Sequence, residues 1–139
     1  MKITLESFEI TERYPVHWGD MDAAKHVNNL MYLRWAESAR IAFVEKMGIN
    51  TSFIPSDIGP ILGWQECKYV FPVTFPDTVI VGIRFFELLE DRFKLECAIF
   101  SDRHKRLAAI SRQDIIPYDY GSLKKVPLPE EWISQLKKL

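Results

Sequence analysis

Polar and apolar residues alternate along the first part of the chain. The apolar positions of this alternation are Phe8, Ile10, Tyr14, Val16 and Trp18. A period of two residues predicts a β-strand with one face toward the core and one polar face. Pro15 has no backbone N–H to donate, so we expect an edge or a bulge at this point of the strand.

A long helix is predicted next. Asn28 and Asn29 are favourable caps, the apolar pattern continues to about Met47, and Gly48 suits the position after the last turn. Apolar residues lie on most sides of this segment, and the polar positions form a narrow stripe, namely Arg34, Glu37, Ser38 and Glu45. We expect such a helix to be enclosed by other elements.

The rest of the chain is rich in strand patterns. Residues 49–60, with two prolines and a glycine, are expected to form a loop. Four strand-like runs follow, at residues 61–71, 78–88, 93–101 and 107–117, and a short helix is expected within residues 127–139. One crossover-length helix among five strands predicts an α+β protein. We expect a single domain over residues 1–139, in which a strongly curved antiparallel sheet wraps around the helix.

Composition narrows the possible functions. The chain of 139 residues is 47% apolar and has a formal net charge of -1, which gives no global attraction to nucleic acid or to an anionic membrane. No signal peptide and no apolar run of the ~18 residues needed for a membrane span is found, so we expect a cytoplasmic protein. Cys67 and Cys97 lie in strand-like runs and are expected to be buried free thiols. Three scattered histidines predict no metal site.

The segment between the first strand and the helix contains the candidate chemistry. Asp22 lies seven residues before Asn29, where free backbone N–H groups and the positive end of the helix dipole are expected. Those N–H groups could stabilise a carbonyl oxygen that gains negative charge, and a nearby carboxylate could attack the carbonyl carbon or activate water. From the residues alone, an aspartate in such a loop is more often a turn former or a cap, which is what we expect of Asp20.

A longer motif strengthens the catalytic interpretation. The string G-D-M-D-x-x-x-H-V-N-N-x-x-Y-L-R-W-x-E, which begins at Gly19, resembles the signature of the 4-hydroxybenzoyl-CoA thioesterase-like acyl-CoA thioesterases of the hotdog superfamily. Weaker matches occur at residues 69–79 and at residues 107–117. The resemblance implies a hotdog fold, a curved antiparallel sheet around one long central helix, and hydrolysis of an acyl-CoA thioester without metal or cofactor.

The resemblance also implies functions for individual residues. Asp22 matches the catalytic nucleophile or general base, and Asn29 matches the residue whose backbone N–H polarises the thioester carbonyl. His26 and Asn28 match positions that shape the site, and His26 could also transfer protons. Relatives are dimers or tetramers with the active site at the dimer interface. In related branches a helix carboxylate does the chemistry, which makes Glu37 a second choice here.

Two positions depart from the family pattern. Lys25 stands where many relatives have glycine, so a positive φ at this position would be strained. Pro76-Asp77 stands where relatives usually have Gly-Asp.

Substrate contacts are predicted from charge and aromatic content. CoA carries several phosphate charges, so a local cluster of cations is required. The candidates are Arg92 with Lys94, and the predicted hairpin tip of Arg103, Lys105 and Arg106 beside His104. An acyl or aryl pocket would draw on Tyr32, Trp35, Trp64, Tyr69 and Phe71, most of which must be core. Two alternatives to an acyl-CoA thioesterase stay open: a thioesterase acting on acyl carrier protein, and a non-catalytic acyl-CoA-binding protein.

Overall fold

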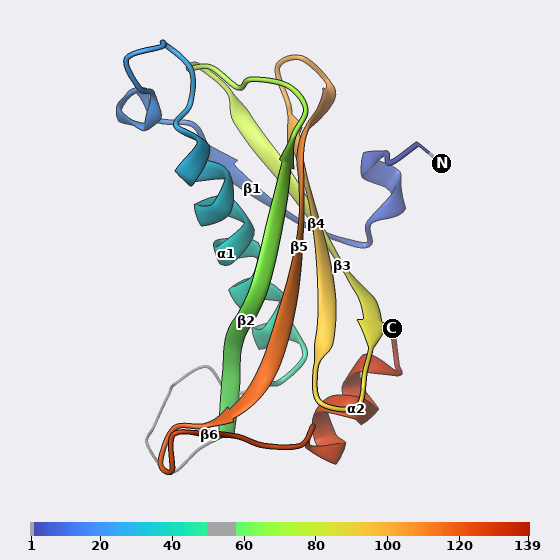
Figure 1. The fold of residues 1–139 in the computed structure, drawn as a ribbon. Coiled ribbons are helices and arrows are strands. Elements are labelled where there is room, and N and C mark those ends of the chain that lie inside the picture. Colours follow the sequence, from blue (N-terminus) through green and yellow to red (C-terminus); the bar gives the residue numbers. More distant parts are fainter. Residues whose placement is uncertain (1, 50–57) are drawn as a thin grey trace.

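The computed structural model describes residues 2–49 and 58–139. Its elements, in chain order, are β1 (Ile10–Pro15), α1 (Asn29–Lys46), β2 (Ile58–Tyr69), β3 (Thr78–Leu88), β4 (Phe93–Ser101), β5 (Arg106–Asp119), β6 (Lys124–Lys125) and α2 (Glu130–Leu136). Figure 1 shows a curved sheet with α1 along one face. The predicted α+β architecture is confirmed.

The sheet is antiparallel in every pairing. Its strands lie in the order β1-β3-β4-β5-β2, and the short β6 pairs with β5. β1 and β2 are therefore the two ends of the main path, and Pro15 lies opposite Thr78 at the end of β1. A proline is compatible with this position because an edge strand has one side without ladder hydrogen bonds.

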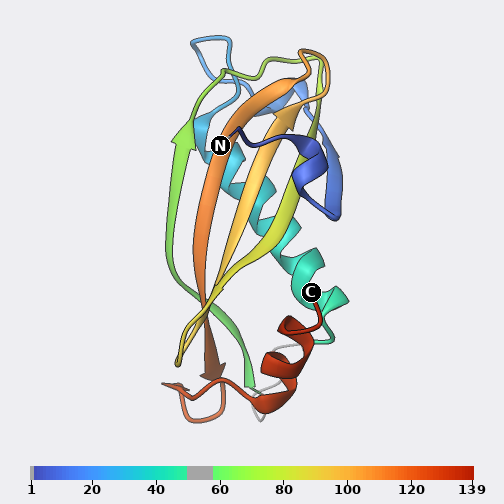
Figure 2. The same ribbon diagram turned by 90° about the vertical axis from the view of Figure 1, so that its right-hand side faces the viewer.

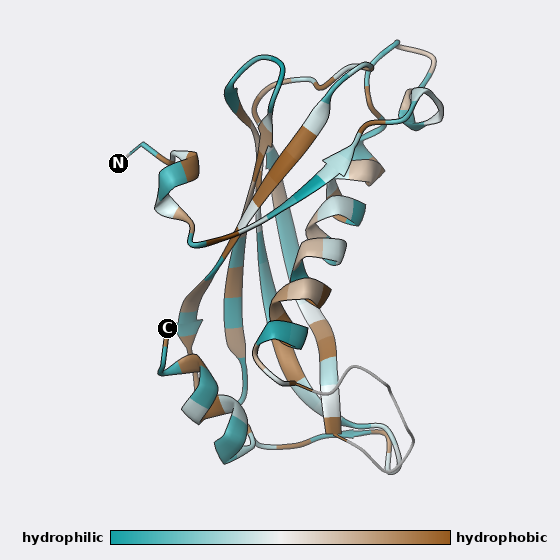
Figure 3. Ribbon diagram, turned by 180° about the vertical axis from the view of Figure 1, so that it is seen from behind, coloured by the Kyte–Doolittle hydropathy of each residue, from teal (hydrophilic) through white to brown (hydrophobic). Residues whose placement is uncertain are grey.

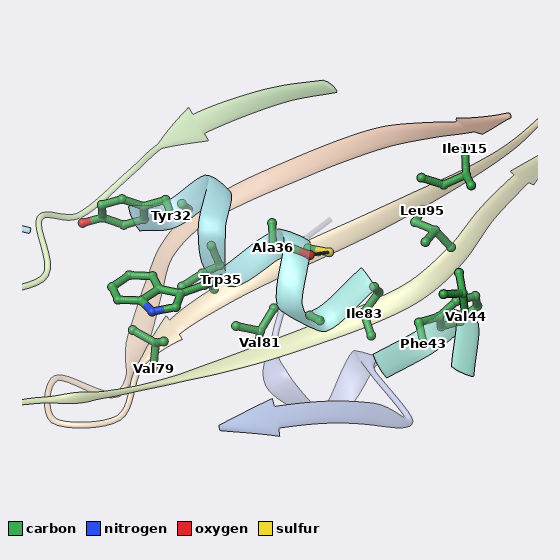
Figure 4. Packing of buried hydrophobic residues seen from close by; sticks show 14 of the residues in the cluster. Tyr32, Trp35, Ala36, Phe43, Val44, Val79, Val81, Ile83, Leu95 and Ile115 are labelled. Carbon is green, nitrogen blue, oxygen red and sulfur yellow. Dashed lines mark hydrogen bonds between the residues drawn. The ribbon is translucent and has the colours of Figure 1, made fainter. Parts of the chain in front are cut away.

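The core lies between α1 and the concave face of the sheet. The buried residues of α1 recur at spacings of three and four, which places them on one stripe: Tyr32, Trp35, Ala36, Ala39, Phe43 and Val44. Figure 4 shows these residues packed against side chains of β3, β4 and β5, such as Val81, Leu95 and Ile115. Burying one such large apolar side chain contributes about 1.5–3 kcal/mol.

One stripe of the helix is exposed. Leu30 and Ile41 are 63% and 41% exposed, on the part of α1 that the sheet of the same chain leaves uncovered. Arg34, Glu37 and Glu45 of the predicted polar stripe are exposed with them, so other elements enclose the helix apart from this stripe.

The convex face of the sheet is covered in part by the N-terminal segment. Figure 2 shows the sheet between this segment and α1. Phe8 packs there with Ile80, Ala98 and Phe100 in a second apolar cluster. The ring lies directly on Gly82, where an added Cβ would come within 2.4 Å of the ring of Phe8. Close approach of the segment thus depends on the absence of a side chain.

The first strand is shorter than predicted. Phe8 precedes β1 and packs on the convex face, whereas Ile10 and Tyr14 pack against the main core. Trp18 belongs to a 3₁₀ turn and is 73% exposed. The alternation thus continues beyond the strand at both ends and overestimates its length.

The later boundaries agree better with the sequence. β3 and β4 span the predicted residues, β5 is longer by one or two residues at each end, and β2 begins at Ile58, inside the predicted loop. Residues 50–57 of that loop lie outside the described residues. β6 was not predicted, because two residues are too few to show a period. Gly48 has a φ of 74° after α1, as its position predicted.

The C-terminal helix α2 adds buried residues to the core. Trp132 and Leu136 of α2 are buried with Phe93 beyond the end of α1.

Cys67 and Cys97 are free thiols, the first half-buried and the second fully buried. Burial raises the pKa of Cys97 to about 12, so this thiol stays protonated. Among the described residues, no helix is long and apolar enough to cross a membrane.

Candidate active site

The loop before α1 folds back on itself and ends at the helix. Met21 and Val27 form an isolated antiparallel bridge, and the N–H of Asp22 donates to the carbonyl of His26 at 2.9 Å. The N–H of Asn28 donates to the carbonyl of Asp20, also at 2.9 Å. Residues 21–27 therefore form a closed turn whose two ends meet at the start of the helix.

Asp22 lies exposed in this turn. Its Oδ1 accepts the N–H of Ala24 at 2.9 Å, and its backbone carbonyl accepts the N–H of Lys25 at 2.9 Å. Within the described residues, the second carboxylate oxygen has no hydrogen-bond partner. Asp22 thus has one oxygen in the turn and one available for chemistry, so the turn-forming and catalytic functions are compatible.

Lys25 has a φ of 64°. This is the left-handed conformation in which a side chain clashes with the backbone, at a cost of about 1 kcal/mol relative to glycine. The strain predicted from the departure at this position is confirmed. Asp20 is the turn former that the sequence predicts, because its Oδ2 accepts the N–H of His17 at 2.8 Å.

The first turn of α1 has one N–H group available. Asn28 is the N-cap, and its Oδ1 accepts the N–H of Leu30 at 3.0 Å. The N–H of Met31 donates to the carbonyl of Asn28. Within the described residues, the N–H of Asn29 has no partner. A free N–H at the positive end of a helix is suited to a developing negative charge on an oxygen.

The segment after β2 supports this loop. The N–H of Val27 donates to the carbonyl of Val73, and the N–H of Val73 donates to the hydroxyl of Tyr32, each at 2.9 Å. Tyr32 is buried, and burial raises the pKa of its hydroxyl. The hydroxyl is used within the protein, which favours a structural function for Tyr32 over the predicted substrate contact.

Tyr69 was predicted as a candidate for the acyl pocket, but its contact with the start of α1 was not predicted. It ends β2, and its hydroxyl donates to the backbone carbonyl of Asn29 at 3.1 Å. Its ring meets that of Tyr32 edge-on at 5.2 Å. Forty positions separate Tyr69 from Asn29 in the sequence, so only the folded sheet shows the contact between them.

A small cavity extends from the first turn of α1 along β2. It measures about 180 Å³, and its lining includes Leu30, Glu37 and Arg40 of the helix and Leu62 of the strand. Glu37 is half-exposed and lies 3.8 Å from a guanidinium nitrogen of Arg40. Arg40 also donates to Gln113 at 3.1 Å. Glu37 is thus associated with a cation of the helix, eight residues beyond Asn29.

The two predicted cation clusters lie at opposite ends of the molecule. The β4–β5 hairpin, with Arg103, Lys105 and Arg106, is at the same end as the Asp22 loop (Figure 1), and it is strongly hydrophilic in Figure 3. Lys105 pairs with Asp102 at 2.7 Å, and Arg106 lies over the ring of Phe71 at 4.3 Å.

Arg92 lies at the other end, in the β3–β4 connection. It pairs with Asp91 at 3.0 Å and with Asp114 at 3.1 Å, and Lys94 pairs with Asp114 at 3.3 Å. The two carboxylates raise the pKa of Arg92 above its ordinary value. Two cations and two carboxylates balance, so this cluster presents no net positive charge in one chain.

Comparison with known proteins identifies the family. The profile described as the thioesterase-like superfamily matches residues 16–136 of this chain. The chain therefore belongs to the thioesterase-like superfamily, a family of thioester hydrolases. No curated protein matches it.

Solved structures agree with this assignment. A Pseudomonas aeruginosa protein proposed to be a thioesterase is 27% identical, with a TM-score of 0.79 over 89% of this chain and 95% of that one. A gentisyl-coenzyme A thioesterase is 24% identical, with a TM-score of 0.81 over 91% and 99% of the two chains. A 1,4-dihydroxy-2-naphthoyl-CoA thioesterase from Synechocystis is 20% identical, with a TM-score of 0.81 over 93% and 96%. The predicted hotdog fold is confirmed.

Proposed function

We propose that this protein hydrolyses an acyl-CoA or aryl-CoA thioester to the free acid and CoA. The observation that supports the proposal is the closed turn of residues 21–27, which carries Asp22 and ends at the start of α1, where the N–H of Asn29 has no partner among the described residues. The thioesterase family and the CoA-thioester substrates named for two similar structures support the same chemistry. A Staphylococcus aureus protein of similar fold, with 13% identity and a TM-score of 0.83 over 92% and 81% of the two chains, was solved in complex with CoA.

In the proposed reaction, the thioester oxygen accepts the N–H of Asn29 while negative charge develops on it. The free oxygen of Asp22 either attacks the carbonyl carbon, which gives an acyl anhydride that water then hydrolyses to the free acid, or removes a proton from the water that attacks the carbonyl carbon. The C–S bond breaks and CoA leaves as a thiolate, which needs little acid assistance. His26 and Asn28 keep the loop and the helix start in place.

We propose that the hairpin tip binds the phosphates of CoA. It is at the same end of the molecule as Asp22, and among the described residues Lys105 is the one of its three cations whose side chain forms an ion pair, with Asp102. Arg92 is the weaker candidate, because Asp91 and Asp114 already neutralise its charge.

We further propose that the working form is a dimer or a larger homo-oligomer. β2 is twelve residues long and has a partner on one side only, β5, among the described residues. Leu30 and Ile41 are exposed beside it, and the cavity of about 180 Å³ is smaller than the 300–1,000 Å³ typical of ligand pockets. A second copy against β2 and α1 would satisfy the strand edge and enlarge the pocket.

The test is Asp22→Asn, which keeps the size of the side chain and the bond to Ala24. We expect kcat for a hydrolysed acyl-CoA to fall by ~10²-fold or more, while KM and the melting temperature change little. Release of CoA thiol from short, medium, long and aryl acyl-CoAs measures the activity.

The matched control is Asp20→Asn, which changes the same group two residues away in a turn-forming position. Near-normal turnover in Asp22→Asn would remove Asp22 from the mechanism and make Glu37 the candidate. An equal loss in both variants would indicate a general effect of charge in the loop.

A further inference from the structure

The N–H of Asn29 is useful as an oxyanion donor only if its direction is fixed before the substrate arrives. The preceding residue is well held, because Asn28 bonds to Asp20 through its N–H and to Leu30 through its side chain. Besides the backbone donor that the helix provides, the carbonyl of Asn29 has a donor from a distant strand. The hydroxyl of Tyr69 donates to the carbonyl of Asn29 at 3.1 Å.

We propose that Tyr69 is a positioning residue that orients the N–H of Asn29 for the thioester oxygen. This inference rests on the proposed thioesterase function and adds to it a residue outside the Asp22 motif. The N–H and the carbonyl of Asn29 belong to two peptide planes that meet at one Cα atom. Fixing the carbonyl from one side and Asn28 from the other therefore defines the direction of the N–H between them.

The surroundings keep Tyr69 in this position. Its Cα pairs with Ala109 in the sheet, and its ring packs edge-on against the buried ring of Tyr32 at 5.2 Å. Burial and the neighbouring Cys67 raise the pKa of Tyr69 above its ordinary value near 10, so the hydroxyl remains a hydrogen-bond donor at neutral pH.

Tyr69 and Tyr32 differ in what the loss of the hydroxyl would leave behind. Tyr32 accepts the N–H of Val73, and removing its hydroxyl leaves a buried donor without a partner. The carbonyl of Asn29 lies in the first turn of α1, where the helix itself provides a backbone donor. Loss of the Tyr69 hydroxyl therefore costs the fold little, and 46% of Tyr69 is exposed.

The experiment is Tyr69→Phe, measured as kcat, KM and melting temperature with an acyl-CoA that the wild-type protein hydrolyses. We expect kcat to fall about fivefold, the effect of one modest hydrogen bond on the transition state, with KM and melting temperature near the wild-type values. Tyr32→Phe is expected to lower the melting temperature clearly, because it leaves the N–H of Val73 unpaired.

The matched control is Tyr120→Phe, which removes another phenol-to-carbonyl bond to β2, from Tyr120 to Pro60 at 2.8 Å. It should leave kcat unchanged. Amide NMR spectra provide a readout besides activity: Tyr69→Phe should shift the resonances of Asn29 and Leu30, and Tyr120→Phe should not.

Several outcomes would overturn the proposal for Tyr69. These are an unchanged kcat, an increase in KM alone, a loss of kcat equal to that of Tyr120→Phe, or unchanged Asn29 and Leu30 resonances. Failure of the proposed function gives a different result: no thiol is released by the wild-type protein, or Asp22→Asn is fully active. A wild-type protein that is active and sensitive to Asp22→Asn, with a Tyr69→Phe variant of normal kcat, rejects only the inference about Tyr69.

Discussion

Lys25 has a backbone conformation that ordinarily favours glycine, with a φ of 64°, within the turn that carries Asp22. The turn is closed by hydrogen bonds on both sides of this residue, from Asp22 to His26 and from Lys25 to Asp22. The surrounding structure therefore imposes the conformation, and the lysine side chain contributes strain but no contact that would compensate for it within the described residues.

Replacing Lys25 with glycine should stabilise the protein. The strain of about 1 kcal/mol is relieved, part of the gain is offset by the greater freedom of glycine in the unfolded chain, and we expect a net increase of about 0.5 kcal/mol in the free energy of unfolding. Urea denaturation measures it. Lys25→Ala is the control, because it removes the charge and keeps the Cβ atom. Equal stability of the two variants would show that the lysine charge, and not the backbone, is responsible.

The residues of the candidate site were predictable to different degrees. Asp22, Asn28 and Asn29 lie in one continuous motif before the helix, and the structure places that motif in a closed turn next to a capped helix start. Their chemical functions stay predictions. The sequence names Tyr69 only as a pocket candidate. Its contact with Asn29 could not be predicted, because a tyrosine that ends a strand has many possible environments and the contact depends on the whole sheet.

Among the elements, the strands bounded by clear breaks were predicted best. β3 and β4 begin and end where the sequence changes from strand-like, largely apolar runs to Pro76-Asp77, Glu90-Asp91 and Asp102. The first strand was predicted too long because Phe8 and Trp18 continue the alternation without belonging to the strand. A periodic pattern records which residues are apolar, but it does not record which surface each one covers.

Gly82 of β3 lies against Phe8 of the N-terminal segment, and substituting it tests that contact. A methyl group at position 82 would overlap the ring of Phe8, so Gly82→Ala should displace the segment and lower the free energy of unfolding by about 1–3 kcal/mol. Chemical denaturation measures the effect. In a Phe8→Ala background the same substitution should have little further effect, because the two residues are in direct contact. Additive losses would mean that Gly82 is required for the strand itself.

On the scale of the whole molecule, two groups of cations lie at opposite ends. They differ in how many of their cations are paired with carboxylates. Among the described residues, one of the three cations of the hairpin tip is paired with a carboxylate, whereas both cations of the β3–β4 connection are paired, with two carboxylates. The formal net charge of -1 conceals this difference. Attraction to a polyphosphate should therefore come from one end only.

Changing Arg103, Lys105 and Arg106 together to glutamine should raise KM for acyl-CoA roughly tenfold, since exposed charge-assisted contacts contribute modestly and are screened by salt. KM for an acyl-N-acetylcysteamine thioester, which lacks the nucleotide, should not change. Steady-state kinetics with both substrates give the comparison.

The corresponding change of Arg92 and Lys94 is the control. It should leave KM for acyl-CoA unaltered but reduce stability by about 2 kcal/mol or more, because Asp114 is buried and loses both of its cations. An increase in KM for acyl-CoA in the variant of Arg92 and Lys94 alone would indicate that the nucleotide binds at the β3–β4 connection. An unchanged KM in both variants would favour acyl carrier protein as the substrate carrier.

The order of the strands has a consequence for how the chain acquires its fold. β1 and β2 are synthesised first, yet β1 pairs with β3 and β2 pairs with β5, so neither can form its ladder until later residues are available. During synthesis, the edges of the future sheet and the apolar stripe of α1 precede the strands that cover them. Such non-local pairing slows folding, and strands with unpaired backbone groups stay exposed for longer. The nascent chain is therefore most vulnerable to aggregation just before β5 is released from the ribosome, when a single missing strand leaves β2 without a partner.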